Sequence, residues 1–283
     1  MVQVNKKTLN IRGRMTNLTA PLVMGILNIT SDSFFAGSRV ISNGQILDLA
    51  GEMVREGVDI IDIGGYSTRP GAADVDVYEE SDRVESAVAP LNKYFPELII
   101  SVDTFRSVVA RRAVEAGAHI INDVSGGNLD VEMFDTVAEL KVPYVLMHMR
   151  GTPQTMNQMT VYRHLVTDIL TDLKQKADVL RSKGVADILI DPGFGFAKTT
   201  AQNFNLMHHL SEFQLLGYPV LVGISRKASI YKTLNITPEE ALNGTTVLNT
   251  IALQNGASVL RVHDVKAAVE AVKLYLSTAN FMN

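Results

Sequence analysis

The sequence contains no cysteine among its 283 residues. Without cysteine the chain has no disulfide bond, no thiolate metal site and no thiol nucleophile. This composition suits the cytoplasm, and we expect that location. The N-terminal stretch is charged and lacks an apolar signal core, and no apolar run is long enough to cross a membrane. We therefore expect no membrane partner.

An excess of positive charge is also missing. The chain has 26 Lys and Arg residues against 30 Asp and Glu residues, which gives a net charge of −4. No overall basic field is available to attract nucleic acid, so we expect no nucleic-acid partner. An anionic small molecule would have to be bound by a few local donors.

Apolar side chains are what the sequence has in quantity. Hydrophobic residues make up 46% and charged residues 20%, so the chain can bury a substantial core. Short runs rich in Val, Ile and Leu alternate eight times with segments of helical period. The expected strands cover residues 22–27, 58–63, 98–102, 119–121, 142–147, 188–190, 219–223 and 259–262. The expected helices cover about 46–56, 78–94, 105–116, 131–140, 161–183, 201–216, a helix that opens at a capping box from Thr237 to Glu240, and 265–276.

This alternation predicts the fold class. Strands that are apolar on both faces and β-branched are typical of a parallel sheet covered by helices. Eight such units predict an α/β fold, a closed (β/α)8 TIM barrel, which typically has ~250 residues. An open doubly wound sheet is the alternative, although no G-x-G-x-x-G fingerprint follows the first strand. We expect one domain over residues 1–283, with a short β-hairpin in 1–20 that covers one end of a barrel in 21–283.

Polar residues follow the expected strands. In a (β/α)8 barrel the carboxyl ends of all strands face one shared mouth, where active sites lie. An Asp or Asn at such a position often serves only as a helix N-cap or turn residue. The spread of carboxylate, amide and cationic groups over so many strand ends indicates a binding site instead. These residues are Asn28, Thr68, Arg69, Asp103, Asn122, Met147, His148, Asp191, Lys227, Arg261 and His263.

Two kinds of chemistry fit these residues. A carboxylate accepts two parallel hydrogen bonds from an amino-pyrimidinone edge, an Asn adds one donor and one acceptor, and a Lys donates to a ring carbonyl. The residues that could bind a flat heterocycle in this way are Asp103, Asn122, Asp191 and Lys227. A guanidinium fork matches phosphate, and Mg²⁺ prefers oxygen ligands. The residues that could hold a diphosphate and its Mg²⁺ are Arg69, Arg261, His263 and Asn28.

Three loops are notable. Residues 29–43 and 66–77 exceed the ~2–6 residues usual between a strand and a helix, and loops of this kind serve as lids over reacting sites. A third loop follows Asp191, where Gly193 and Gly195 allow a tight turn that carries two aromatic residues. Beside a carboxylate at a strand end, these aromatic residues suit a small-molecule site, and core packing is the alternative interpretation for both Phe194 and Phe196.

Eight motifs, in this order, resemble the bacterial-type dihydropteroate synthases, a family of pterin-binding barrels. The motifs are M-G-I-L-N-I-T-S-D-S-F (24–34), D-I-G-G-Y-S-T-R-P-G-A (62–72), S-V-D-T (101–104), I-N-D-V-S-G-G (121–127), L-M-H-M (146–149), D-P-G-F-G-F (191–196), S-R-K (225–227) and R-V-H-D-V (261–265). The resemblance implies a (β/α)8 barrel that is usually a cytosolic homodimer. It implies a folate-biosynthesis transferase that joins 4-aminobenzoate to (7,8-dihydropterin-6-yl)methyl diphosphate, with Mg²⁺ as cofactor. Sulfonamides act in this family as 4-aminobenzoate mimics.

The resemblance also implies roles for single residues. Asn28 would be the Mg²⁺ ligand. The pterin diphosphate would be bound by Thr68, Arg69, Asp103, Asn122, Met147, Asp191, Lys227, Arg261 and His263. The 4-aminobenzoate slot would be formed by Phe34, Thr68, Pro70 and Phe196. The residues expected to act in catalysis are Asp103, Lys227, Arg261 and His263.

The chain departs from the family pattern at a few positions. Ser31 replaces a usual Pro, Tyr66 stands where Glu is common, and Ala197 stands where Gly is common. Most relevant is Ala228, because the usual Ser hydroxyl there meets the 4-aminobenzoate carboxylate. Here that carboxylate would rely on backbone N–H groups at the start of the following helix. These departures concern 4-aminobenzoate affinity and the sulfonamide response, not the expected pterin site.

Two other functions remain open from the sequence. A methyltetrahydrofolate-binding methyltransferase domain would share the Asp, Asn and Asp residues that face a heterocycle. It has no need of the diphosphate-binding residues in S-R-K and R-V-H-D. A barrel that has kept the pterin pocket and lost turnover is the third hypothesis, and Tyr66 and Ala228 motivate it.

Overall fold

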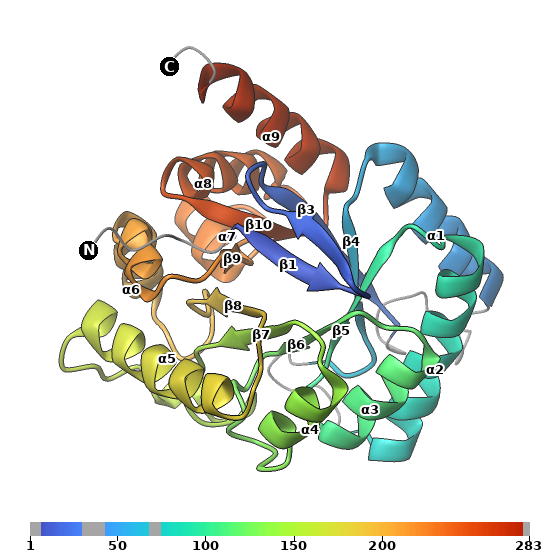
Figure 1. Ribbon diagram of the computed structural model, residues 1–283. Coiled ribbons are helices and arrows are strands. Elements are labelled where there is room, and N and C mark those ends of the chain that lie inside the picture. The colour runs from blue at the N-terminus through green and yellow to red at the C-terminus, as the bar shows by residue number, and fades with distance from the viewer. Residues whose placement is uncertain (1–6, 30–42, 68–74, 280–283) are drawn as a thin grey trace.

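A closed barrel forms the centre of the molecule. The computed structural model describes residues 7–29, 43–67 and 75–279. Eight parallel strands close in the order β10–β3–β4–β5–β6–β7–β8–β9, and helices surround them (Figure 1). The strands are β3 (Leu22–Asn28), β4 (Ile60–Gly64), β5 (Ile99–Asp103), β6 (Ile120–Asp123), β7 (Tyr144–Met147), β8 (Ile188–Asp191), β9 (Val220–Val222) and β10 (Ala257–Val262). The predicted (β/α)8 barrel is confirmed, and the open doubly wound sheet is excluded.

Helices follow the strands and cover the outside of the barrel. The α-helices are α1 (Asn43–Glu56), α2 (Val77–Tyr94), α3 (Ser107–Ala116), α4 (Met133–Leu140), α5 (Leu165–Ser182), α6 (Thr200–His208), α7 (Ala228–Leu234), α8 (Leu242–Gln254) and α9 (Val265–Ala279). Short 3₁₀ helices cover Met156–Gln158 and Leu210–Leu216. The second of these continues α6, so the expected helix over 201–216 is an α-helix followed by a 3₁₀ helix.

The prediction for the segment between β9 and β10 is wrong. It holds two helices, α7 and α8, instead of one helix that opens at Thr237. The capping box forms only in part, since the Thr237 backbone N–H donates to Glu240 Oε2 at 2.9 Å. Arg226 Nη1 donates to the carbonyls of Pro238 at 2.9 Å and Glu239 at 2.7 Å. Because a distant side chain engages these carbonyls, the segment forms a turn before α8.

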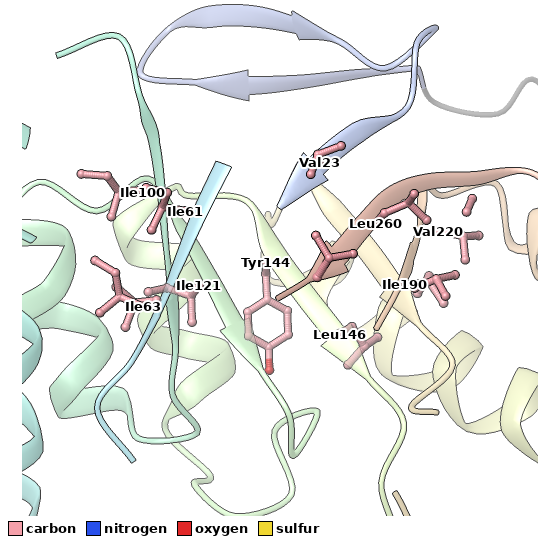
Figure 2. Close-up of a cluster of buried hydrophobic side chains, with 14 of the residues drawn as sticks. Val23, Ile61, Ile63, Ile100, Ile121, Tyr144, Leu146, Ile190, Val220 and Leu260 are labelled. Atoms are coloured by element: carbon pink, nitrogen blue, oxygen red, sulfur yellow. The ribbon is translucent and has the colours of Figure 1, made fainter. Parts of the chain in front are cut away.

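The outward faces of the strands form the larger core. Side chains alternate between the two faces of a strand, and one face packs against the helices. Figure 2 shows buried side chains from all eight strands in this layer. Those labelled are Val23, Ile61, Ile63, Ile100, Ile121, Tyr144, Leu146, Ile190, Val220 and Leu260.

The inward faces form a second apolar cluster near the N-terminal ends of the strands. Its strand members are Met24, Ile60, Ile120, Val145, Leu189, Leu221 and Val259. The antiparallel hairpin of β1 (Thr8–Ile11) and β2 (Arg14–Asn17) adds Leu9 and Ile11 to the same cluster, and Leu18, directly after β2, joins them. The predicted hairpin therefore covers the N-terminal end of the barrel. This leaves the carboxyl ends of the strands as the place for a site.

In the part of the chain that the structure describes, every helix is too short or too polar to cross a membrane.

Candidate active site

The interior of the barrel becomes polar toward the carboxyl ends of the strands. Two or four residues beyond the apolar inward side chains, the strands present the same face again. Seven side chains of this inward face come from seven different strands. They are Asn28, Asp62, Asp103, Asn122, Met147, Asp191 and Arg261. All of them except Asp62 are predicted site residues, so the structure brings these predicted residues onto one face.

Arg261 lies between two carboxylates. Its Nε donates to Asp62 Oδ2 at 2.6 Å, and its Nη2 donates to Asp103 Oδ2 at 2.8 Å. Asn122 Nδ2 donates to the same Asp62 oxygen at 3.0 Å. One network therefore connects β10, β4, β5 and β6 across the barrel interior.

Burial shifts the pKa values of three predicted site residues. Burial raises the pKa of Asp103 to about 7, because desolvation outweighs the attraction of Arg261, and neighbouring carboxylates add to the shift. Burial likewise raises the pKa of Asp191 against the opposing charge of Lys227. Burial lowers the pKa of Lys227 to about 8. Perturbed groups of this kind gather at functional sites.

The loop after β8 links the interior to an aromatic side chain. Asp191 Oδ1 accepts from the Gly193 backbone N–H at 2.7 Å. Lys227 Nζ donates to the Phe194 carbonyl and lies 4.6 Å from the centre of the Phe196 ring. Phe194 is fully buried in the outer core, which confirms its interpretation as a packing residue. Phe196 is half-buried beside the site.

Lys198 holds this loop from within, and the sequence interpretation missed it. Its Nζ donates to the carbonyls of Gly193 at 2.8 Å and Phe196 at 2.9 Å, and it lies 3.2 Å from His148 Nδ1. Burial lowers the pKa of Lys198 to about 7. Burial, together with the Lys198 charge, lowers the pKa of His148 to about 2, so His148 is neutral and can accept from the ammonium group. No sequence signal separates this lysine from an exposed one.

An apolar wall adjoins the polar residues. Met147 packs with other buried side chains and with three half-buried ones, and sulfur and aromatic groups of this kind suit contact with a flat ring. The buried members are Val124, Met147, Met149, Met156 and Ala197, and the half-buried ones are Phe105, Leu129 and Phe196.

His263 follows the end of β10 at the mouth. Its Nδ1 lies 3.0 Å from Ser225 Oγ, and its backbone N–H donates to the same hydroxyl at 3.2 Å. The middle residue of S-R-K, Arg226, forms a bidentate pair with Asp264, at 2.8 Å from Nε and 2.7 Å from Nη2. These contacts join the segments after β9 and β10. They therefore fix the backbone positions from which the Lys227 and His263 side chains extend.

Asn28 is the predicted metal ligand. Its Oδ1 lies against Gly64 of β4, where an added Cβ would come within 3.1 Å of it. Across residues 7–29, 43–67 and 75–279, no group of three or more His, Asp and Glu could hold a metal by itself. Mg²⁺ keeps several waters and binds to few protein oxygens plus substrate phosphates. A single amide oxygen therefore fits Mg²⁺ that binds together with a phosphate-bearing ligand.

Four predicted site residues lie outside the described residues. They are Phe34, Thr68, Arg69 and Pro70. Most of the loops over 29–43 and 66–77 lies outside them as well. The roles given to these residues and loops stay predictions.

Asp62 is the second residue that the sequence interpretation missed. A signal for it does exist, because an Asp stands in the middle of the apolar run from Ile60 to Gly64. Residues two apart share a face, so Asp62 must face the barrel interior with Ile60. A buried carboxylate needs a partner, and Arg261 on the last strand has the matching charge.

Known proteins share this architecture and sequence. Residues 24–263 match the family described as "Pterin binding enzyme". The dihydropteroate synthase of Synechocystis sp. is 43% identical over 255 residues, which are 89% of this chain and 88% of that protein. The Yersinia pestis dihydropteroate synthase, solved with a sulfonamide drug complex, has a TM-score of 0.91 at 40% identity and covers 96% of this chain and 99% of its own.

The Xanthomonas albilineans dihydropteroate synthase gives two further similar structures. One contains 4-aminobenzoic acid, with a TM-score of 0.89 at 40% identity, over 96% of this chain and 98% of that chain. The other is a complex with 7,8-dihydropteroate, with a TM-score of 0.84 at 36% identity, and it covers 97% of this chain and 99% of that chain. These relatives favour the synthase over the methyltransferase hypothesis. The chain therefore belongs to the pterin binding enzymes and, within them, to the dihydropteroate synthases, a family of transferases.

Proposed function

We propose that this chain joins 4-aminobenzoate to (7,8-dihydropterin-6-yl)methyl diphosphate and releases 7,8-dihydropteroate and diphosphate. The observation that carries the proposal is the group of buried and half-buried carboxylates, amide and guanidinium inside a barrel whose other end is filled by apolar side chains. Buried donors and acceptors in this mixture suit a flat heterocycle. The relatives solved with 4-aminobenzoic acid and with 7,8-dihydropteroate support the choice of substrates.

Recognition of the heterocycle is assigned to four residues. Asp191 already accepts from Gly193 through Oδ1, so we assign Oδ2 to the ligand. Lys227 would donate to a ring carbonyl in place of the Phe194 carbonyl that it contacts here. Asp103 and Asn122 would complete the set, and Met147 would pack against the ring.

The reaction needs charge stabilisation more than proton transfer. The C–O bond of the methylene group breaks, and its electron pair leaves with the diphosphate. The amine nitrogen attacks the methylene carbon, a C–N bond forms, and the nitrogen loses a proton. Arg261 and His263 would stabilise the leaving group, and the Asp103 carboxylate would favour positive charge on the pterin. Because an aryl amine needs no strong base, the site mainly has to orient it.

Mg²⁺ is the proposed cofactor. Asn28 would hold it together with the diphosphate, as the single amide oxygen at that position permits. When bound, the ion would neutralise negative charge on the leaving group.

The 4-aminobenzoate slot is assigned to Phe34, Thr68, Pro70 and Phe196. Of these, Phe196 is described by the structure, half-buried under Lys227. Ala228 is the first residue of α7, so no hydroxyl is present at the position where the family usually has one. We propose that this weakens the hold on the carboxylate and changes the response to sulfonamides.

An assay tests the proposal. Purified protein with both substrates and Mg²⁺ should form dihydropteroate. Binding of the pterin diphosphate without turnover would support the non-catalytic binder instead, and absence of binding would contradict the proposal. Asp191→Asn and Lys227→Met should each raise the pterin Kd by roughly 10-fold or more, because each removes a charged hydrogen-bonding group. Lys232→Met, an exposed position on α7, is the matched control.

We also propose a cytoplasmic homodimer, which the family resemblance supports. Leu234 of α7, Val247 of α8 and Leu274 of α9 are 50%, 50% and 69% exposed. α8 contacts both α7 and α9, so these apolar side chains lie on consecutive helices. Size-exclusion chromatography with light scattering should give about twice the chain mass of 30.9 kDa. Val247→Glu should shift the protein toward monomer, and a wild-type monomer would contradict the proposal.

A further inference from the structure

Asp62 is a buried charge that the proposed reaction does not use directly. It is 0% exposed in the middle of β4. Its Oδ2 accepts from both Arg261 and Asn122, as described above. Its Oδ1 is also buried and has no hydrogen-bond partner among the described residues. Burying a carboxylate is unfavourable unless an opposite charge compensates it, and Arg261 is the cation in contact with it.

The contact with Asp62 sets the orientation of the Asn122 amide. Asn122 Nδ2 donates to the Asp62 oxygen that also accepts from Arg261 Nε, so the amide turns its nitrogen toward Asp62. The amide oxygen then lies on the other side of Cγ and becomes the atom that a ligand meets. A ligand N–H is therefore favoured opposite Asn122, and a ligand carbonyl is disfavoured.

The same carboxylate also fixes the Arg261 side chain. Arg261 is bonded to Asp62 through Nε and to Asp103 through Nη2, so the guanidinium plane is held at two points. A guanidinium has five N–H donors, and these two bonds leave three for a ligand. Without Asp62, Asp103 alone would hold the arginine, and the Asn122 amide could take either orientation.

We propose that Asp62 is a positioning residue for heterocycle recognition. It fixes the Arg261 guanidinium and turns the amide oxygen of Asn122 toward the ligand, an inference that rests on the proposed function. If Asp62 served only as a structural counter-charge, its substitution would change the stability of the fold. It would not weaken pterin binding while leaving 4-aminobenzoate unaffected.

The first test compares a substitution within β4 with one at Asp59, the residue that precedes the strand. Asp62→Asn should raise the Kd of 6-hydroxymethyl-7,8-dihydropterin, measured by titration calorimetry, by roughly 10-fold or more. The KM for 4-aminobenzoate should stay within roughly twofold, since the hydrogen bonds of Asp62 go to Arg261 and Asn122, on the heterocycle side of the site. Asp59→Asn is the matched control, because Asp59 accepts from the Val23 backbone N–H, away from the site. Unchanged pterin affinity in Asp62→Asn would overturn the proposal.

A second test asks whether Asp62 acts through Asn122. In an Asn122→Ser background, Asp62→Asn should lose clearly less affinity than in the wild type, because the coupled partner is already gone. Equal losses in both backgrounds would contradict the coupling to Asn122.

The third test needs no folded Asp62 variant. A structure of the wild-type chain with the dihydropterin should place a ligand N–H opposite Asn122, and a ligand carbonyl there would overturn the proposal. Each of the three tests has a readout of the bound pterin that needs no turnover, and the KM for 4-aminobenzoate is the one kinetic measurement. A wild type that binds the pterin but forms no product contradicts the proposed function and still tests Asp62.

Discussion

At the scale of single residues, a buried histidine links stability to pH. His119 is 5% exposed, and its Nδ1 accepts from the Ile100 backbone N–H at 2.8 Å. Burial, with a smaller contribution from the Arg12 charge, lowers its pKa to about 4. In the unfolded chain a histidine takes up its proton near pH ~6.5. Between these two values the unfolded chain binds more protons, so the free energy of unfolding falls as the pH falls.

Replacing His119 by Asn tests this link. The Asn oxygen can accept the same backbone N–H but takes up no proton. Between about pH 7.5 and pH 5, the wild type should lose about 2 kcal/mol of unfolding free energy through His119, and His119→Asn should lose less by that amount. Urea unfolding at the two pH values measures the difference. His208→Asn, at an exposed position, is the control, and equal losses in His119→Asn and wild type would contradict the prediction.

The predictable site residues are those that a local rule can place. Asp103, Asn122 and Asp191 follow from the positions of the strand ends and from the alternation of strand faces. Asp62 pairs with Arg261, which is 199 positions away in the chain, and the alternation of strand faces alone does not reveal that pairing. Lys198 depends on the backbone path of a turn that folds over it. Residues that act through distant partners are therefore the ones that sequence reasoning misses.

At the scale of elements, the end of α4 contains local strain. Its C-cap residue, Lys141, has φ 54° and ψ 38°, a left-handed conformation that favours glycine. A non-glycine residue in this conformation lowers stability by about 1–2 kcal/mol. A glycine lowers it by about 0.5–1 kcal/mol, because glycine has more conformational freedom to lose when the chain folds. Lys141→Gly should therefore raise the free energy of unfolding by about 0.5–1 kcal/mol.

Lys141→Ala separates strain from charge. It removes the same ammonium group but keeps a side chain in the left-handed conformation, so its stability should stay within about 0.5 kcal/mol of wild type. Urea unfolding midpoints of the two variants measure the contrast. Equal midpoints for the glycine and alanine variants would show that the cap conformation contributes nothing.

Element boundaries were predictable where glycine marks them. Gly57, Gly117 and Gly217 have positive φ values of 94°, 116° and 78°, and each stands where the sequence predicts a helix to stop. The segment before α8 was not predictable in this way, because the Arg226 side chain engages its carbonyls from 12 and 13 positions away. A capping motif predicts a helix only when its carbonyls remain available for helical pairing.

At the scale of the whole molecule, the two ends of the barrel differ in composition and in the role that we assign to them. Apolar side chains and the hairpin fill the N-terminal end, and the polar network lies toward the other. This separation was predictable because the hairpin and the strand-end motifs occupy different parts of the sequence. The division into a hairpin over 1–20 and a barrel over 21–283 stays a prediction. It raises the question of whether the hairpin and the barrel fold as one cooperative unit.

Truncation of a hairpin side chain tests that coupling. Leu9 is fully buried among the inward side chains of the strands, whereas Met15 on the same hairpin is 64% exposed. Leu9→Ala should lower the free energy of unfolding by about 3 kcal/mol, because a closed ring of strands has little freedom to collapse around the cavity. Met15→Ala should change it by less than about 0.5 kcal/mol. The dihydropterin Kd should be unchanged in both variants, since the site lies toward the opposite end. An unaltered barrel transition in Leu9→Ala, followed by circular dichroism during urea unfolding, would mean that the hairpin folds independently of the barrel it covers.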